Sequence, residues 1–371
     1  MCGRFCLEEK EKMKVGIVTQ PLYANYGGIL QNFALQQVLR KMGHTPVTLD
    51  YMPSLSFGRY LLYAGKGVLC ALSPSRRHPI KPYHHFLKRP SDIASFVKQH
   101  VATTSTISHY SKQILKKYGI EALIAGSDQI WRYSYNSHYI EDMYLAFAKD
   151  FPCRKIAYGA SFGVENWDYP AARTAEVKEL VKQFDAVSVR ENSAAVLCKD
   201  NLGVEAQVVL DPTLLLPASV FEEYCYIPHS DSQSYLAAYI LDINEEKKAF
   251  IEAIAGNKGL KVKDMTVSEQ GISIEEWLST IKNAGYVITD SYHGSLFSII
   301  FRKQFQTFVN KERGADRFLT LFSKLGLTAY LLDEIPLRPT KLEDIDYSSV
   351  SIKLQQLQEG SIAFLQKSLN P

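Results

Sequence analysis

Short apolar runs rich in β-branched residues alternate along the chain with stretches whose apolar positions recur at helical spacing. The first run spans residues 14–19, and a helical pattern over 29–42 follows it and ends at Gly43. Such alternation predicts parallel sheets with crossover helices. Further strands are expected at 46–50, 121–125, 154–158, 185–189, 206–210, 235–241, 260–264, 285–289 and 304–309.

The strands fall into two series, and a stretch between about 212 and 232 with three prolines separates them. A length of 371 residues also favours two domains over one. We expect a polar, poorly ordered tail over 1–12 and an N-terminal Rossmann-like domain over 13–217. A C-terminal Rossmann-like domain over 218–371 ends in a partly helical segment that we expect to pack back across the first domain.

Residues 57–100 interrupt this rhythm, with an apolar and aromatic part over 57–73 and a basic part over 76–89. One interpretation is an excursion with a solvated basic helix, because runs of charge usually face water. The other is a peripheral contact with the inner membrane surface or with a lipid diphosphate, where basic and aromatic side chains act together.

The composition excludes several classes of protein. Hydrophobic residues make up 46% and charged residues 22%, and this balance is typical of packed domains and not of disorder. A net charge of +3 gives no sign of nucleic-acid binding, and no apolar run reaches the roughly 20 residues of a membrane span. The 6 cysteines are scattered without zinc-site spacing, so we expect free thiols in the cytoplasm and no metal site.

No Walker A loop, G-x-G-x-x-G or H-E-x-x-H motif is present, so candidate chemistry must lie in less general segments. The first follows the first strand and contains Asn25, Gly27 and Gly28. Paired glycines at a strand-to-helix turn expose backbone N–H groups to an anionic ligand, although a tight turn without a ligand has the same pattern.

The second segment follows the strand at 121–125 and contains Ser127, Asp128, Gln129, Trp131 and Arg132. The carboxyl ends of parallel strands form the edge where α/β sheets bind ligands. Hydroxyl, carboxylate, amide and aromatic groups there suit a sugar. The alternative is a capped short helix with a tryptophan in the core.

The third segment ends the strand at 185–189 with Arg190, which can bind a carboxylate or phosphate through two hydrogen bonds. The alternative is a structural ion pair of Arg190 with Glu191 or Asp185.

The fourth segment leads from the strand at 285–289 into an apolar helix. Asp290 or Ser291 can cap that helix, which places His293, Gly294 and Ser295 at its N-terminus. Free N–H groups, the positive end of the helix dipole and an imidazole together suit a phosphate and acid/base chemistry. A histidine with a purely structural role remains the alternative.

These segments, in this order and with Asp211-Pro212-Thr213, resemble the polysaccharide pyruvyl transferase family over roughly residues 14–310. The resemblance implies two Rossmann-like halves facing across a cleft, as in the glycosyltransferase-B class. It also implies transfer of the enolpyruvyl group of phosphoenolpyruvate onto two hydroxyls of one sugar, which forms a cyclic pyruvate ketal. We expect a cytoplasmic transferase of surface polysaccharide biosynthesis whose sugar acceptor is lipid-linked.

By this resemblance His293 is the catalytic acid/base or phosphate-contacting residue. The residues expected to bind the donor are Arg190, Ser291, Gly294, Ser295, Asn25, Gly27 and Gly28. Those expected to bind the acceptor are Ser127, Asp128, Gln129, Trp131 and Arg132.

The chain departs from the family pattern in one place, because many members have an arginine where Ser291 stands here. The missing charge must come from another cation, and Arg132, Arg313 and Arg317 are the candidates. Two alternative functions remain open at this stage. One is a nucleotide-sugar-dependent glycosyltransferase of the same architecture, and the other is a non-catalytic sugar-binding or scaffold protein.

Overall fold

The structure is a computed structural model that describes residues 12–23, 25–52, 90–226, 234–265, 272–336 and 342–370. The apolar part of the expected excursion and its basic part both lie within 53–89, outside the described residues. The expected tail lies outside them as well, up to residue 11.

The first half of the chain builds a sheet of six parallel strands in the order β2-β1-β3-β4-β5-β6. The strands are β1 Lys14–Val18, β2 Thr45–Thr48, β3 Ala122–Asp128, β4 Arg154–Ala160, β5 Ala186–Val189 and β6 Gln207–Val208. The helices of this half are α1 Tyr26–Lys41, α3 Ser91–His100, α4 Lys112–Tyr118, α5 Tyr133–Asn136, α6 Ile140–Met143, η2 Ala146–Ala148, α7 Ala171–Val181, α8 Asn192–Leu197 and η3 Cys198–Leu202.

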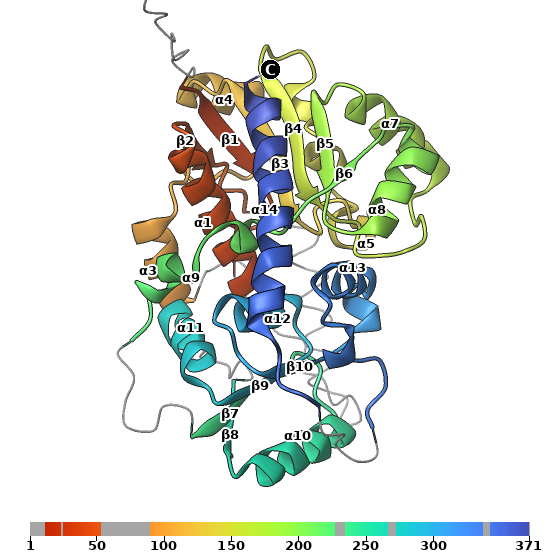
Figure 1. Cartoon of the computed structure of the whole chain (residues 1–371). Helices are drawn as coiled ribbons and strands as arrows, with labels where there is room; N and C mark the ends of the chain where they lie inside the picture. The colour runs from red at the N-terminus through yellow and green to blue at the C-terminus, as the bar shows by residue number, and fades with distance from the viewer. Residues whose placement is uncertain are drawn as a thin grey trace, which may run out of the picture.

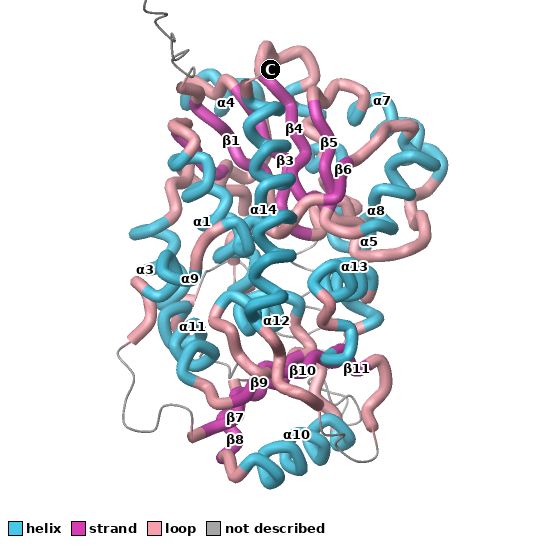
Figure 2. Tube along the Cα trace, in the orientation of Figure 1, coloured by secondary structure: helices cyan, strands magenta, loops and turns pink. Residues whose placement is uncertain are grey.

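The second half builds a sheet of five parallel strands in the order β11-β10-β9-β7-β8. The strands are β7 Tyr235–Tyr239, β8 Lys261–Asp264, β9 Tyr286–Thr289, β10 Phe305–Phe308 and β11 Leu331–Leu332. Its helices are α10 Glu245–Lys258, α11 Ile274–Asn283, α12 Tyr292–Ile300, η5 Lys311–Arg313, α13 Asp316–Leu325 and η6 Thr328–Tyr330. Figure 2 shows the two sheets at opposite ends of the molecule, with helices between them.

The two sheets repeat one topology. In the first sheet β1 lies between β2 and β3, and in the second β7 lies between β8 and β9. The direction in which successive strands are added therefore reverses beside β1 and beside β7, and ligands bind at the carboxyl ends of strands at such switch points. The predicted fold class, two parallel-sheet α/β domains, is confirmed.

The predicted elements differ from the observed ones mainly at the carboxyl ends of strands. Helix α1 begins at Tyr26 and not at Ile29, so Gly27 and Gly28 lie in its first turn. Strand β3 extends to Asp128, past the expected end at Ala125. In both places residues that were expected in a loop belong to a regular helix or strand at the edge of the sheet.

The connection between the two sheets carries η4 Pro212–Leu215 and α9 Ala218–Glu222. Phe221 of α9 is fully buried and lies between the two domains. Its ring centroid lies 6.3 Å from that of Phe33 in α1 and 4.9 Å from that of Phe297 in α12. A single apolar cluster therefore continues from the first domain into the second.

Helix α14, Tyr347–Leu369, returns from the second domain and runs along the first (Figure 1). Its Leu365 is fully buried, and two hydrogen bonds fix the helix on the first sheet. Arg154 of β4 donates from Nε to the Ser368 carbonyl at 2.7 Å, and the Leu210 N–H donates to Ser361 Oγ at 2.9 Å. Within the described ranges no helix is both long enough and apolar enough to cross a bilayer.

Replacing Leu365 with alanine should destabilise the protein by about 2–5 kcal/mol, because a fully buried leucine is removed and a cavity remains. The matched control is Ile352→Ala on the same helix, where the side chain is 64% exposed and a change within about 0.5 kcal/mol is expected. Urea unfolding of both variants measures the difference. Equal effects at the two positions would show that α14 does not stabilise the first domain through this contact.

Candidate active site

A cavity of about 550 Å³ lies between the two sheets, at both switch points. From the first domain it is lined by Gln20 after β1 and by Asp128 and Gln129 at the end of β3. From the second it is lined by Leu241 after β7 and by residues 290–293 after β9. The facing edges of the two domains thus bring one candidate site together.

The start of α12 presents His293 to this cavity. Ser291 is the N-cap, and its Oγ accepts a hydrogen bond from the Gly294 N–H at 3.4 Å. The His293 ring lies against Gly27 in the first turn of α1, where any Cβ would overlap the imidazole. A glycine at position 27 is what lets the two helices approach at the histidine.

Asp211 lies behind the imidazole and is fully buried. Its Oδ2 is 3.6 Å from His293 Nε2, a distance for electrostatic attraction and not for a hydrogen bond. Its Oδ1 accepts hydrogen bonds from the Thr213 N–H at 3.0 Å and from the Thr213 hydroxyl at 2.8 Å. Burial alone would raise the pKa of Asp211. The interactions with His293, Arg190 and Thr213 lower it by more, so its pKa lies well below the usual range.

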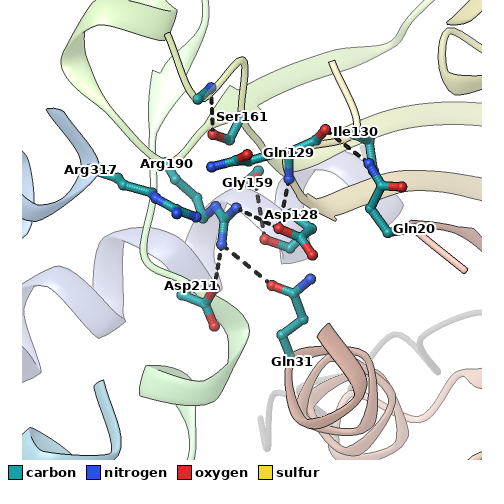
Figure 3. Close-up of polar contacts among 12 residues, drawn as sticks. Gln20, Gln31, Asp128, Gln129, Ile130, Gly159, Ser161, Arg190, Asp211 and Arg317 are labelled. Atoms are coloured by element: carbon teal, nitrogen blue, oxygen red, sulfur yellow. Dashed lines mark hydrogen bonds and ion pairs between the residues drawn. The ribbon is translucent and has the colours of Figure 1, made fainter. Parts of the chain in front are cut away.

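Arg190 is enclosed among carboxylates and an amide (Figure 3). It donates from Nη1 to Asp211 Oδ2 at 2.8 Å and to Gln31 Oε1 at 3.4 Å, and from Nη2 to Asp128 Oδ1 at 3.2 Å. Burial lowers the pKa of Arg190, but Asp211 and Asp128 raise it more, so the guanidinium stays charged. Its side chain is not exposed at all, and its charge is already shared by two carboxylates.

Arg190 does not line the cavity, but among the described residues two arginines do. Arg313 donates to both carboxylate oxygens of Asp242, at 2.7 Å and 3.0 Å, which fixes its guanidinium at the edge of the cavity. Arg317 is buried and donates from Nη2 to the Arg313 carbonyl at 2.7 Å. Burial and the neighbouring Arg190 lower the pKa of Arg317 to about 10, so it is still a cation near neutral pH.

Asp290 lines the cavity but holds the backbone in place. Its carboxylate accepts hydrogen bonds from the Leu241 N–H at 2.6 Å and the Asp242 N–H at 3.1 Å, and from Lys247 Nζ at 2.8 Å. These contacts fix the loop after β7 against the end of β9, so the cap of α12 falls to Ser291 alone.

The sequence profile of the polysaccharide pyruvyl transferase family matches residues 25–312. The chain belongs to the polysaccharide pyruvyl transferase family. The matched span contains Asp211, Arg190, His293 and most of the residues that line the cavity, while β1 and Arg317 lie outside it.

A search of curated proteins finds no match. Among solved structures, the chain is similar to a glycosyltransferase from Rickettsia africae, with 10% identity, a TM-score of 0.48, and coverage of 97% of this chain and 94% of that one. It is also similar to a UDP-N-acetylglucosamine 2-epimerase from Rickettsia bellii, with 10% identity, a TM-score of 0.39, and coverage of 96% and 99%. A heptosyltransferase from E. coli has 10% identity, a TM-score of 0.39, and coverage of 80% and 88%.

Of the donor residues expected from the family resemblance, the structure brings His293, Ser291 and Asn25 to the cavity wall. The others lie behind that wall. Gly294 packs against Thr289, and the Ser295 hydroxyl lies 2.9 Å from the Thr307 hydroxyl in the core. The residues placed behind the wall are Gly27, Gly28, Arg190, Gly294 and Ser295.

The residues expected to bind the family's sugar acceptor also divide. Asp128 and Gln129 line the cavity. Ser127 donates its hydroxyl to the Gly159 carbonyl at 2.9 Å, and Trp131 is fully buried with its ring stacked on Tyr144 at 4.8 Å. Arg132 lines a different cavity. The core tryptophan therefore follows the structural alternative weighed from the sequence.

Sequence reasoning gave this family member no role for Asp211. A signal was present, because Asp211 follows the strand expected at 206–210 and so lies at the same sheet edge as Arg190 and Asp128. The structural alternative for Arg190 named Glu191 or Asp185 as the partner. The observed partners are Asp211 and Asp128, while Asp185 lies 3.8 Å from Arg154.

Replacing Gly27 with alanine should displace the His293 ring, because the new methyl group overlaps the imidazole. The control is Gly256→Ala in α10, where the added Cβ meets no atom within 4 Å and a helical alanine should stabilise by about 0.5–1 kcal/mol. NMR of histidine-labelled protein would report a changed imidazole signal in the first variant only. An unchanged His293 signal in Gly27→Ala would contradict the close approach.

Replacing Asp211 with asparagine should cost about 3–5 kcal/mol at neutral pH, because Arg190 keeps only one carboxylate. The pKa of Asp211 is lower in the folded than in the unfolded chain, so its stabilisation is present above the unfolded value and is lost as pH falls below about 4. The variant should therefore show a smaller loss of stability in acid than the parent. Urea unfolding across pH 2–7 measures both effects, and parallel pH curves would count against the charged Asp211.

Proposed function

We propose that this chain is a pyruvyl transferase that moves the enolpyruvyl group of phosphoenolpyruvate onto two hydroxyls of one sugar. The product is a cyclic pyruvate ketal, and the second product is inorganic phosphate. The observation that carries the proposal is the His293–Asp211 pair at the start of α12, in the wall of the interdomain cavity of a chain that belongs to this family.

The donor carries a phosphate and a carboxylate, so its site must supply cations and N–H donors. Arg313 and Arg317 line the cavity and are the cations we assign to the donor. The N-terminus of α12 adds the positive end of a helix dipole at the same wall. These two arginines would supply the charge that many family members carry at the position of Ser291. Arg132 is the least suited of the three candidates because it does not line this cavity.

His293 is suited to move the protons of the reaction. Its Nε2 faces the Asp211 carboxylate, which fixes the ring and stabilises an imidazolium when one forms. We assign the exchange with substrate to the other ring nitrogen, Nδ1. Because Asp211 stays ionised, the pair can accept a proton from a hydroxyl and then return it.

The steps balance as follows. The methylene carbon of phosphoenolpyruvate gains a proton and becomes a methyl group, which makes C2 electrophilic. One sugar hydroxyl attacks C2 and loses its proton. The C2–O bond to phosphate then breaks, and a second hydroxyl of the same sugar closes the ring. The two hydroxyls lose two protons in total. One proton balances the proton gained by the methyl group, and the other leaves with the phosphate.

The acceptor would lie against the first domain, where Asp128 and Gln129 line the cavity. Asp128 Oδ1 is engaged by Arg190 and by the Gln129 N–H, while Oδ2 appears in neither of these hydrogen bonds and is the oxygen we assign to an acceptor hydroxyl. The cavity mouth carries the exposed apolar side chains of Tyr135 (50%) and Leu241 (37%). This rim supports a lipid-linked sugar as acceptor, used by a cytoplasmic enzyme at the inner membrane surface.

The decisive assay mixes the protein, phosphoenolpyruvate and a panel of free and lipid-linked sugars, and measures released phosphate and product mass. The expected product is heavier than the acceptor by one pyruvate less one water. His293→Ala should lower turnover by about 10²–10⁴ and leave the melting temperature near that of the parent. The matched control is His109→Ala, an exposed histidine outside the cavity, which should keep full turnover.

Two outcomes would overturn the proposal. Release of a nucleotide from a UDP- or GDP-sugar, with no phosphate release from phosphoenolpyruvate, would indicate a glycosyltransferase. Turnover of His293→Ala equal to that of the parent per folded molecule would remove the imidazole from the chemistry.

A further inference from the structure

A second cavity, of about 880 Å³, lies between the domains beside the first. A bridge separates the two, in which Gln129 Nε2 donates to the Arg313 carbonyl at 2.8 Å. Beside it Gly314, at φ 98°, comes so close to the first domain that a Cβ would lie 3.0 Å from the Gly163 carbonyl oxygen. Arg317 borders both cavities.

The wall of the second cavity holds a buried carboxylate that is only half satisfied. Glu191 is 2% exposed, and its Oε1 accepts a hydrogen bond from the Ser161 hydroxyl at 2.7 Å. Its Oε2 has no hydrogen-bond partner within the described residues, and the same is true of Arg317 Nε and Ser193 Oγ. An unpartnered buried polar atom costs about 1–3 kcal/mol, and proteins rarely leave one without reason. All three atoms are fully enclosed in the wall, so they lie behind the surface that a ligand would touch.

The charges of the walls do not suit an anion. The acidic side chains are Glu165, Asp168, Glu191, Asp316 and Asp333. The basic ones are Arg132, Lys311 and Arg317, so among the described residues of this wall acids outnumber bases five to three. A phosphate or carboxylate would meet net repulsion here.

Several of these charges already have partners. Lys311 pairs with Asp333 at 3.0 Å, and Asp316 accepts the Ser193 N–H at 2.8 Å. Glu165, Asn166 and Asp168 belong to the exposed wall, on either side of the partly exposed Trp167. The Trp167 ring is held by stacking on Tyr169 at 4.4 Å and by its Nε1 donating to the Thr174 hydroxyl at 2.9 Å.

We propose that this second cavity binds a neutral sugar at a site separate from the reacting centre. Carboxylates accept hydrogen bonds from hydroxyls, the Asn166 amide both accepts and donates them, the Trp167 ring covers C–H groups, and the Arg317 guanidinium is a further donor. A volume of this size fits the usual range for a bound small molecule. The inference depends on the geometry of this cavity and not on pyruvyl transfer, so it stands apart from the function proposed above.

The test titrates the full chain, without phosphoenolpyruvate, with the methyl glycosides of glucose, galactose, mannose and N-acetylglucosamine. Calorimetry measures affinity and tryptophan emission reports location. Trp131 and Trp277 are fully buried, so a sugar-dependent change in emission is assigned to Trp167. We expect at least one glycoside to bind saturably and to change this emission. Trp167→Ala should then weaken its binding by tenfold or more.

Two further variants separate the cavities. Asp168→Asn changes an exposed wall residue and should also weaken binding. Because Asp168 is exposed, this variant should fold even if Trp167→Ala does not. His293→Ala should bind the glycoside as the parent does, because His293 lines only the first cavity. Absence of saturable binding overturns the proposal. So does binding that survives Trp167→Ala and Asp168→Asn, or binding that is lost in His293→Ala.

Discussion

A guanidinium enclosed in protein must be matched by carboxylates, and this requirement organises the centre of the molecule. Arg190 draws Asp128 from the end of β3 and Asp211 from the segment after β6, two strands that are not neighbours in the sheet. Leaving either charge alone in the interior would cost several kcal/mol. The ends of β3, β5 and β6 are therefore held together by these ion pairs before any substrate is present.

The ion pairs around Arg190 also involve the second domain, because Asp211 faces His293 at the start of α12. The carboxylate thus has two tasks that favour the same charge state. It neutralises a structural cation, and it orients the imidazole that we assign to proton transfer. Fixing the carboxylate by Thr213 and Arg190 means that the histidine meets a partner whose position is already set.

Much of this arrangement could be predicted from the sequence, and the reason is physical. Strand ends in parallel sheets gather at one edge, so the segments around Asp128, Arg190 and His293 could be assigned to a common site from their position after apolar runs. The family resemblance added the chemistry.

The pairing of side chains could not be predicted in the same way. Whether Arg190 faces a ligand or a carboxylate depends on which strand ends converge, and that depends on the order of strands in the sheet. Trp131 shows the same limit, because a tryptophan after a strand can cover a sugar or fill a core. In this structure the Trp131 ring stacks on Tyr144 and so belongs to the core. Arg317 could be offered only as one candidate cation among several, since its place between two cavities arises from the packing of α13.

Helix α14 has a consequence for how the protein is made. The first sheet is complete in sequence by β6, but the strip beside β4 and η4 stays uncovered until the last helix arrives from the other side of the second domain. During synthesis on the ribosome, the apolar strip of the first domain that α14 later covers therefore stays exposed while the whole second domain is translated. A bound chaperone would have its longest opportunity on that strip, and a stalled nascent chain would expose it.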